Sequence, residues 1–107
     1  ALYVGRGLDD LNIYWFEEPV APEDLEGYKE LKDKLKTNIA GGEAEFTKWG
    51  WKNLINNRCV DIAQPEVCGL GGITEYLKVS DFFVNASQKK FLNAILDKIS
   101  KFSRVKE

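Results

Sequence analysis

Apolar residues recur along the chain in two alternating patterns, one typical of amphipathic helices and the other of short buried strands. Helical spacing predicts helices over residues 2–11, 22–35, 47–56, 73–84 and 87–102. Short apolar runs that end near proline or glycine predict strands over residues 13–16, 37–42 and 60–67. The strands begin roughly 20 to 25 residues apart, which is the spacing of βα units in a parallel sheet. The pattern therefore predicts an α/β fold of about three consecutive βα units with a further helix at the C-terminal end.

Local signals mark where several of these elements begin or end. Pro22, followed by two acidic residues, predicts a helix with proline in its first turn. Glu30 and Lys34 are spaced to pair on the outer face of that helix, and Thr47 is placed to cap the next one. The glycine-rich segment 69–72 matches neither of the common nucleotide-binding glycine patterns. We therefore expect it to form a tight connection between strand and helix.

The composition narrows the class of protein. The chain has 107 residues, of which 44% are hydrophobic and 30% charged, as expected for one soluble folded domain. A net charge of -2 gives no basic excess of the kind that a nucleic-acid or membrane-surface partner requires. The apolar runs are too short to span a bilayer and no secretory signal is visible, so we expect a cytoplasmic location. The chain contains no histidine, which excludes an imidazole base within it.

The cysteines and tryptophans fit a structural role better than a chemical one. Cys59 and Cys68 form no CxxC motif and have no histidine to complete a zinc site, so we expect ordinary small apolar residues in a reducing compartment. Trp15, Trp49 and Trp51 are expected to pack in the core and against helices, because no basic residues interleave with them as on a nucleic-acid stacking platform.

Acidic residues follow each of the three predicted strands. Glu17 and Glu18 end the first strand, Glu43 follows the second, and Glu66 lies near the end of the third. The carboxyl ends of parallel strands meet at one edge of a sheet, where ligands bind in α/β folds. Converging carboxylates repel one another unless a cation lies between them, and Mg²⁺ prefers such oxygen ligands. This pattern favours a metal site over a set of solvated loop acids.

Three segments of the chain together resemble a known family. They are WFEEPVAPEDLEGYKEL, IAGGEAEFTKWG and VDIAQPEVCGLGGITEYLKV. This combination resembles the mandelate racemase and muconate lactonizing enzyme family of the enolase superfamily, in particular its acid-sugar dehydratases and sugar-lactone cycloisomerases. The resemblance covers residues 1–79 and implies a partial TIM-type (β/α) barrel, followed over residues 80–107 by a divergent helical tail.

The resemblance implies roles for three carboxylates. It identifies Glu17 and Glu43 as two of the three Mg²⁺ ligands of the family. Glu66 stands where the family has an aspartate that supports a catalytic histidine, and its carboxylate reaches about one methylene further. Asp61, nearer the start of the same strand, does not match that aspartate. The implied reaction removes the proton α to a sugar carboxylate, stabilises the enediolate with Mg²⁺ and eliminates water.

The resemblance also implies that parts of the active site are missing. In the family the third metal ligand and a lysine base lie on earlier strands, and a histidine base lies on a later one. We therefore expect a fragment of a Mg²⁺-dependent acid-sugar dehydratase that is inactive alone and would take a sugar acid as substrate when complete. The alternative is a non-catalytic remnant or interaction module. In both cases the open sheet would expose its edges and could self-associate.

Overall fold

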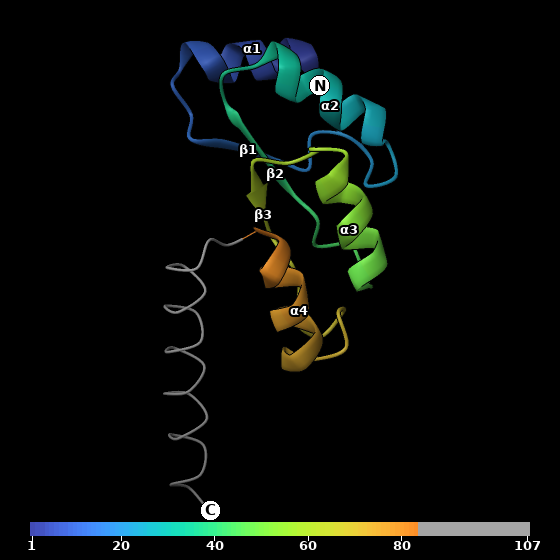
Figure 1. Cartoon of the computed structure of the whole chain (residues 1–107). Helices are drawn as coiled ribbons and strands as arrows, with labels where there is room; N and C mark the ends of the chain where they lie inside the picture. Colours follow the sequence, from blue (N-terminus) through green and yellow to red (C-terminus); the bar gives the residue numbers. More distant parts are fainter. Residues whose placement is uncertain (84–107) are drawn as a thin grey trace, which may run out of the picture.

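A computed structural model describes residues 1–83 as three strands alternating with four helices (Figure 1). In chain order these are α1 (Leu2–Asp10), β1 (Trp15–Glu17), α2 (Leu25–Lys34), β2 (Asn38–Gly41), α3 (Lys48–Asn56), β3 (Ile62–Ala63) and α4 (Ile73–Phe83). The predicted order of elements is confirmed over this part of the chain. The helix predicted over residues 87–102 lies outside the described residues.

The strands form one parallel sheet in the order β1-β2-β3. Trp15 is level with Asn38, and Ala40 is level with Ile62. Each strand is followed by a helix, so each crossover returns the chain to the same end of the sheet. The fold is therefore α/β and has the arrangement of a segment of a (β/α) barrel, as predicted.

The hydrophobic core lies between this sheet and its helices. Buried side chains from α2, β2, α3, α4 and the adjoining loops form one cluster, namely Tyr28, Leu31, Ile39, Trp51, Leu54, Cys59, Leu70 and Val79. Ile39 and Trp51 are fully buried, and removing an apolar side chain of this size from water contributes roughly 1.5–3 kcal/mol. Figure 1 shows α1 beside α2 at one end of the sheet, and α3 and α4 together along its side.

Two of the three tryptophans expected to pack in the core and against helices are largely exposed. Trp51 is buried as predicted, but Trp15 is 46% exposed and Trp49 is 66% exposed. Trp49 lies on the side of α3 opposite Trp51, where the ammonium groups of two lysines approach its ring. The prediction was wrong for Trp15 and Trp49 because residue type alone does not show which face of an element is covered.

Side-chain caps begin two of the helices. The backbone N–H of Gly27 donates to Asp24 at 2.9 Å, and that of Gly50 donates to the Thr47 hydroxyl at 3.1 Å. The Thr47 cap was predicted, as was the ion pair between Glu30 and Lys34 on α2. Pro22 was expected in the first helical turn and instead precedes it, because Asp24 provides the cap and α2 begins after it.

The third strand is much shorter than the predicted span of residues 60–67. Regular strand structure is confined to Ile62–Ala63, although the N–H groups of Asp61 and Gln64 extend the pairing to the carbonyls of Ile39 and Gly41. Pro65 has no N–H to donate to the sheet, so the pairing stops before it.

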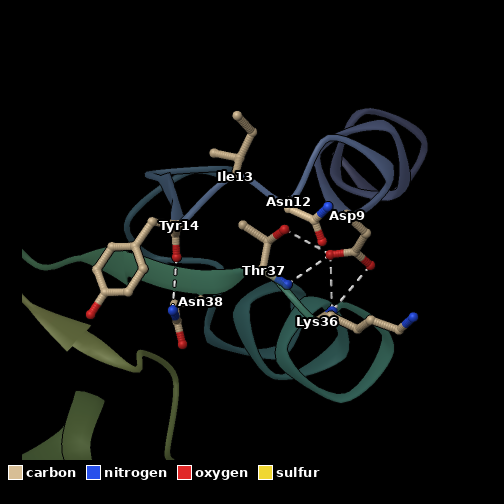
Figure 2. Close-up of a pocket in the computed structure, with 7 residues that line it drawn as sticks. All are labelled: Asp9, Asn12, Ile13, Tyr14, Lys36, Thr37 and Asn38. Carbon is tan, nitrogen blue, oxygen red and sulfur yellow. Dashed lines mark hydrogen bonds between the residues drawn. The ribbon is translucent and has the colours of Figure 1, made fainter.

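Two aspartates fix the amino end of β2. Figure 2 shows the Asp9 carboxylate facing the start of this strand, where it accepts from the backbone N–H groups of Lys36 and Thr37 and from the Thr37 hydroxyl. Asp61 accepts from the N–H of Ile39 at 2.9 Å through one oxygen and pairs with Lys32 at 2.9 Å through the other. Both carboxylates therefore satisfy strand N–H groups at the end of the sheet away from Glu17.

Candidate metal site and active site

Glu17 ends β1 on the face of the sheet that points away from the helices. Its neighbour Phe16 is level with Ile39, which is buried in the core between sheet and helices. Side chains alternate between the faces of a strand, so Glu17 projects from the opposite face, the interior face of a barrel. Its carboxylate is exposed and accepts from the indole N–H of Trp15, with 3.3 Å between Nε1 and Oε2.

Glu43 follows β2 and is presented by a glycine turn. Gly42 has a φ of +109°, and a Cβ at this position would lie 2.3 Å from the ring of Trp51. Only glycine combines this backbone conformation with so close an approach of the indole. The turn leaves Glu43 exposed just beyond the carboxyl end of the strand.

Glu66 follows the third strand and contacts backbone N–H groups of its own loop. The N–H of Gly69 donates to Glu66 Oε2 at 2.5 Å. This hydrogen bond, with a second from the backbone of Cys68, holds the pKa of Glu66 below its usual value because both favour the charged form. The loop continues through Gly71 and Gly72, both at positive φ, as the tight strand-to-helix connection that was predicted. The support of a catalytic base by Glu66 stays a prediction.

The topology brings these three glutamates to one edge of the sheet, because each follows the carboxyl end of one of three adjacent parallel strands. Carboxylate oxygens are the donors that Mg²⁺ prefers, so the donor types of Glu17 and Glu43 fit this ion. Within residues 1–83, however, no group of three or more His, Cys, Asp or Glu side chains could hold a metal ion. The described part of the chain therefore contains no closed set of metal ligands, and the role of Glu17 and Glu43 as ligands stays a prediction.

Further polar groups lie near this edge, namely Glu18, which the sequence pattern already indicated, and Gln64 and Glu45, which it did not. Glu18 has a positive φ of 41°, and its Oε1 is buried without a hydrogen-bond partner among the described residues, as is Oε1 of Gln64. Burial raises the pKa of Glu45, and the charge of Glu23 adds to this effect. The sequence signal that could have identified Gln64 and Glu45 is their position two residues from Glu66 and Glu43. Buried polar atoms without partners are rare in proteins and concentrate at functional sites.

A separate pocket lies at the opposite end of the sheet. It is lined by residues that precede or begin β1 and β2, and Figure 2 shows them: Asp9, Asn12, Ile13, Tyr14, Lys36, Thr37 and Asn38. Because it opens at the amino ends of the strands, it is not formed by the glutamates. Asp9, its main carboxylate, is already engaged by the start of β2.

Comparison with known proteins places this geometry in a family. Residues 1–88 match the family described as enolase C-terminal domain-like. The chain is 38% identical over 81 residues to arabinonate dehydratase of Saccharolobus solfataricus and 36% identical over 80 residues to D-galactarolactone cycloisomerase of Agrobacterium fabrum. These alignments cover 76% and 75% of the chain, and 22% and 21% of the two relatives.

Solved structures show the same similarity. The crystal structure of the 3,6-anhydro-D-galactonate cycloisomerase from Zobellia galactanivorans matches 77% of the chain with a TM-score of 0.71 and 44% identity, over 24% of its own length. L-Talarate dehydratase from Polaromonas sp. JS666, complexed with Mg and L-glucarate, matches 76% of the chain with a TM-score of 0.73 and 32% identity, over 23% of its length.

Among residues 1–83, no helix is long and apolar enough to cross a membrane.

Proposed function

Since the chain belongs to the enolase C-terminal domain-like family, we propose that it contributes part of the active site of an acid-sugar dehydratase or cycloisomerase, with Glu17 and Glu43 as Mg²⁺ ligands. The observation that carries this proposal is the placement of these glutamates after adjacent parallel strands, at the same edge of the sheet. Its similarity to a dehydratase whose structure contains Mg and L-glucarate supports the choice of cation and of a sugar acid as substrate.

In the proposed reaction the two glutamates would hold the cation at the mouth of the sheet, where the sugar carboxylate would bind. Bound Mg²⁺ would supply Lewis-acid stabilisation to the charge that develops when the proton α to that carboxylate is removed. Glu66, held ionised by its loop, contributes negative charge at the third strand. The chain contains no histidine, so we propose that the proton-abstracting base and the third metal ligand come from polypeptide outside these residues.

A non-catalytic interaction module is the second candidate. The observation in its favour is the exposure of large apolar side chains at and just before β1, where Ile13 is 42%, Tyr14 70% and Trp15 46% exposed. Exposed apolar groups beside an unpaired strand edge favour association with another chain.

A calorimetric titration of the chain with Mg²⁺ distinguishes the two candidates. We expect weak binding that Glu17→Gln and Glu43→Gln each abolish, because both changes remove a charged ligand and preserve the shape of the side chain. Glu30→Gln, on the outer face of α2, is the matched control and should bind as the unchanged chain does. Binding that survives both ligand substitutions would refute the site. Self-association with no effect of Mg²⁺ would favour the interaction module.

A further inference from the structure

Trp15 is a large aromatic residue on the same face of β1 as Glu17. It lies in β1, outside the hydrophobic core, and remains 46% exposed, whereas Trp51 is fully buried. Its indole N–H donates to Oε2 of Glu17, two residues further along the same strand. Residues two apart in a strand share a face, so the strand geometry itself brings this donor to the carboxylate.

The indole of Trp15 also contacts the ring of Tyr14, the residue before it. The rings of Tyr14 and Trp15 meet edge to face, with 5.6 Å between centroids and an interplanar angle of 75°. This is the preferred arrangement of an aromatic pair and restricts the indole plane. The ring contact and the hydrogen bond therefore both favour an orientation of the indole with its N–H toward Glu17.

The chemistry of the indole limits what Trp15 can do. Its nitrogen is a donor only, so it cannot bind a cation. It can, however, occupy one carboxylate oxygen of Glu17 and leave the other available, and among residues 1–83 Oε1 of Glu17 accepts no hydrogen bond. A glutamate that already accepts such a hydrogen bond has less rotamer freedom left to lose when it binds a metal ion.

We propose that Trp15 is a positioning residue for Glu17, whose indole N–H holds Oε2 and presents Oε1 to a divalent cation. This inference rests on the proposed role of Glu17 as a metal ligand and adds a residue that holds it. Hydrogen-bonding partners of metal ligands commonly change metal affinity by about 10–100-fold when they are removed. The bond at 3.3 Å is long, so we expect an effect of about tenfold, at the lower end of this range.

The hydrogen bond can be tested without metal by NMR of the three tryptophan indole N–H groups. Trp15→Phe identifies the signal of Trp15 by its disappearance. We expect this N–H to exchange with water more slowly than that of the exposed Trp49, and to lose this protection in Glu17→Ala, which removes the acceptor. If Glu17→Ala leaves the Trp15 signal and its exchange unchanged, the hydrogen bond does not exist in solution and the inference is wrong.

The positioning role is tested with Mn²⁺ as the probe, by measuring free Mn²⁺ with electron paramagnetic resonance. Trp15→Phe keeps an aromatic ring and removes only the donor, and we expect it to weaken Mn²⁺ binding about tenfold. Trp49→Phe is the matched control and should have no effect, since Trp49 lies on the outer side of α3. Near-ultraviolet and far-ultraviolet circular dichroism of each variant show whether the fold is kept.

The outcomes separate this inference from the proposed function. If Glu17→Gln abolishes Mn²⁺ binding and Trp15→Phe does not change it, Glu17 is a ligand and the positioning role is wrong. If neither Glu17→Gln nor Glu43→Gln changes Mn²⁺ binding, the metal site itself is wrong and the positioning role falls with it.

Discussion

The absence of a Cβ atom at Gly42 allows two features at once. It lets Trp51 of α3 pack close to the backbone, and it allows the turn that presents Glu43. Gly42→Ala places a Cβ at positive φ and against the Trp51 ring, whereas Gly72→Ala places one at a similar φ with nothing within 4 Å. Backbone strain of this kind costs about 1–3 kcal/mol. In chemical denaturation we expect Gly72→Ala to lower the free energy of unfolding by that cost alone. Gly42→Ala should lower it clearly further, because its Cβ also meets the Trp51 ring. Equal losses in the two variants would show that Trp51 moves aside freely.

Tyr28 gives a prediction about alkaline pH. Burial, with a further contribution from the charge of Glu18, raises the pKa of the Tyr28 phenol from 10.0 to about 12. Because the folded state favours the neutral phenol, its contribution to stability is complete below about pH 10 and is lost as the pH rises toward 12.

An ultraviolet titration should therefore show one of the four tyrosines ionising about two pH units late, or only as the chain unfolds. Tyr28→Phe should remove that late phase. Tyr3→Phe, which changes a tyrosine that is 92% exposed, is the control and should leave the late phase unchanged. A late phase that persists in Tyr28→Phe would contradict the assignment.

For single residues, the positions of the Glu17 and Glu43 carboxylates could be predicted from the sequence, but the side chains around them could not. Glu17 and Glu43 could be located because each follows a strand, and strand ends are visible in the apolar pattern. The role of Trp15 was missed because its side chain faces away from the helices, and that depends on the register at which β1 begins. An aromatic residue in a short apolar run carries no local signal of its face.

Asp9 connects α1 to the start of β2. It accepts hydrogen bonds from the backbone N–H groups of Lys36 and Thr37, which lie 27 and 28 residues further along the chain. Hydrogen bonds from Thr37 and Lys36 hold the pKa of Asp9 below its ordinary value of 3.8. A lowered pKa means that this stabilisation is present at neutral pH and is lost as the pH falls below 3.8 through the folded-state value.

Asp9→Asn should therefore lower the melting temperature at neutral pH and have progressively less effect as the pH falls below 3.8. Asp10→Asn, the exposed neighbour at the end of the same helix, is the control. Thermal unfolding followed by circular dichroism over a series of pH values measures both. A difference between the variants that does not depend on pH would show that the charge of Asp9 is unimportant.

The type and order of the elements were predictable because each helix and strand has a distinct apolar period. Their ends were less predictable, since they are set by hydrogen bonds that compete locally. Pro22 gave a helix-start signal, but Asp24 three residues before Gly27 gave the stronger one. The predicted span of the third strand continues past Ala63 to residue 67, yet pairing ends where Pro65 removes a donor.

For the whole molecule, the open sheet predicts association through β1. Within residues 1–83 this strand pairs only with β2, and Tyr14 beside it is 70% exposed. We expect sedimentation velocity to show a concentration-dependent oligomer that Tyr14→Lys weakens, because a charge beside a strand edge opposes pairing. Tyr3→Lys makes the same change on α1, away from the sheet, and should leave association unchanged. A monomer at all concentrations would contradict this prediction.

The contacts between elements also determine which βα unit unfolds most easily. The principal contacts between elements join β1 to β2, β2 to β3, α2 to β2, α1 to α2 and α3 to α4, so each βα unit is coupled mainly to the next one. Such coupling is that of a linear array, in which opening a unit at the end breaks one interface and opening the middle unit breaks two. Cooperativity therefore centres on β2, and the two aspartates at its amino end stabilise the unit on which the others depend.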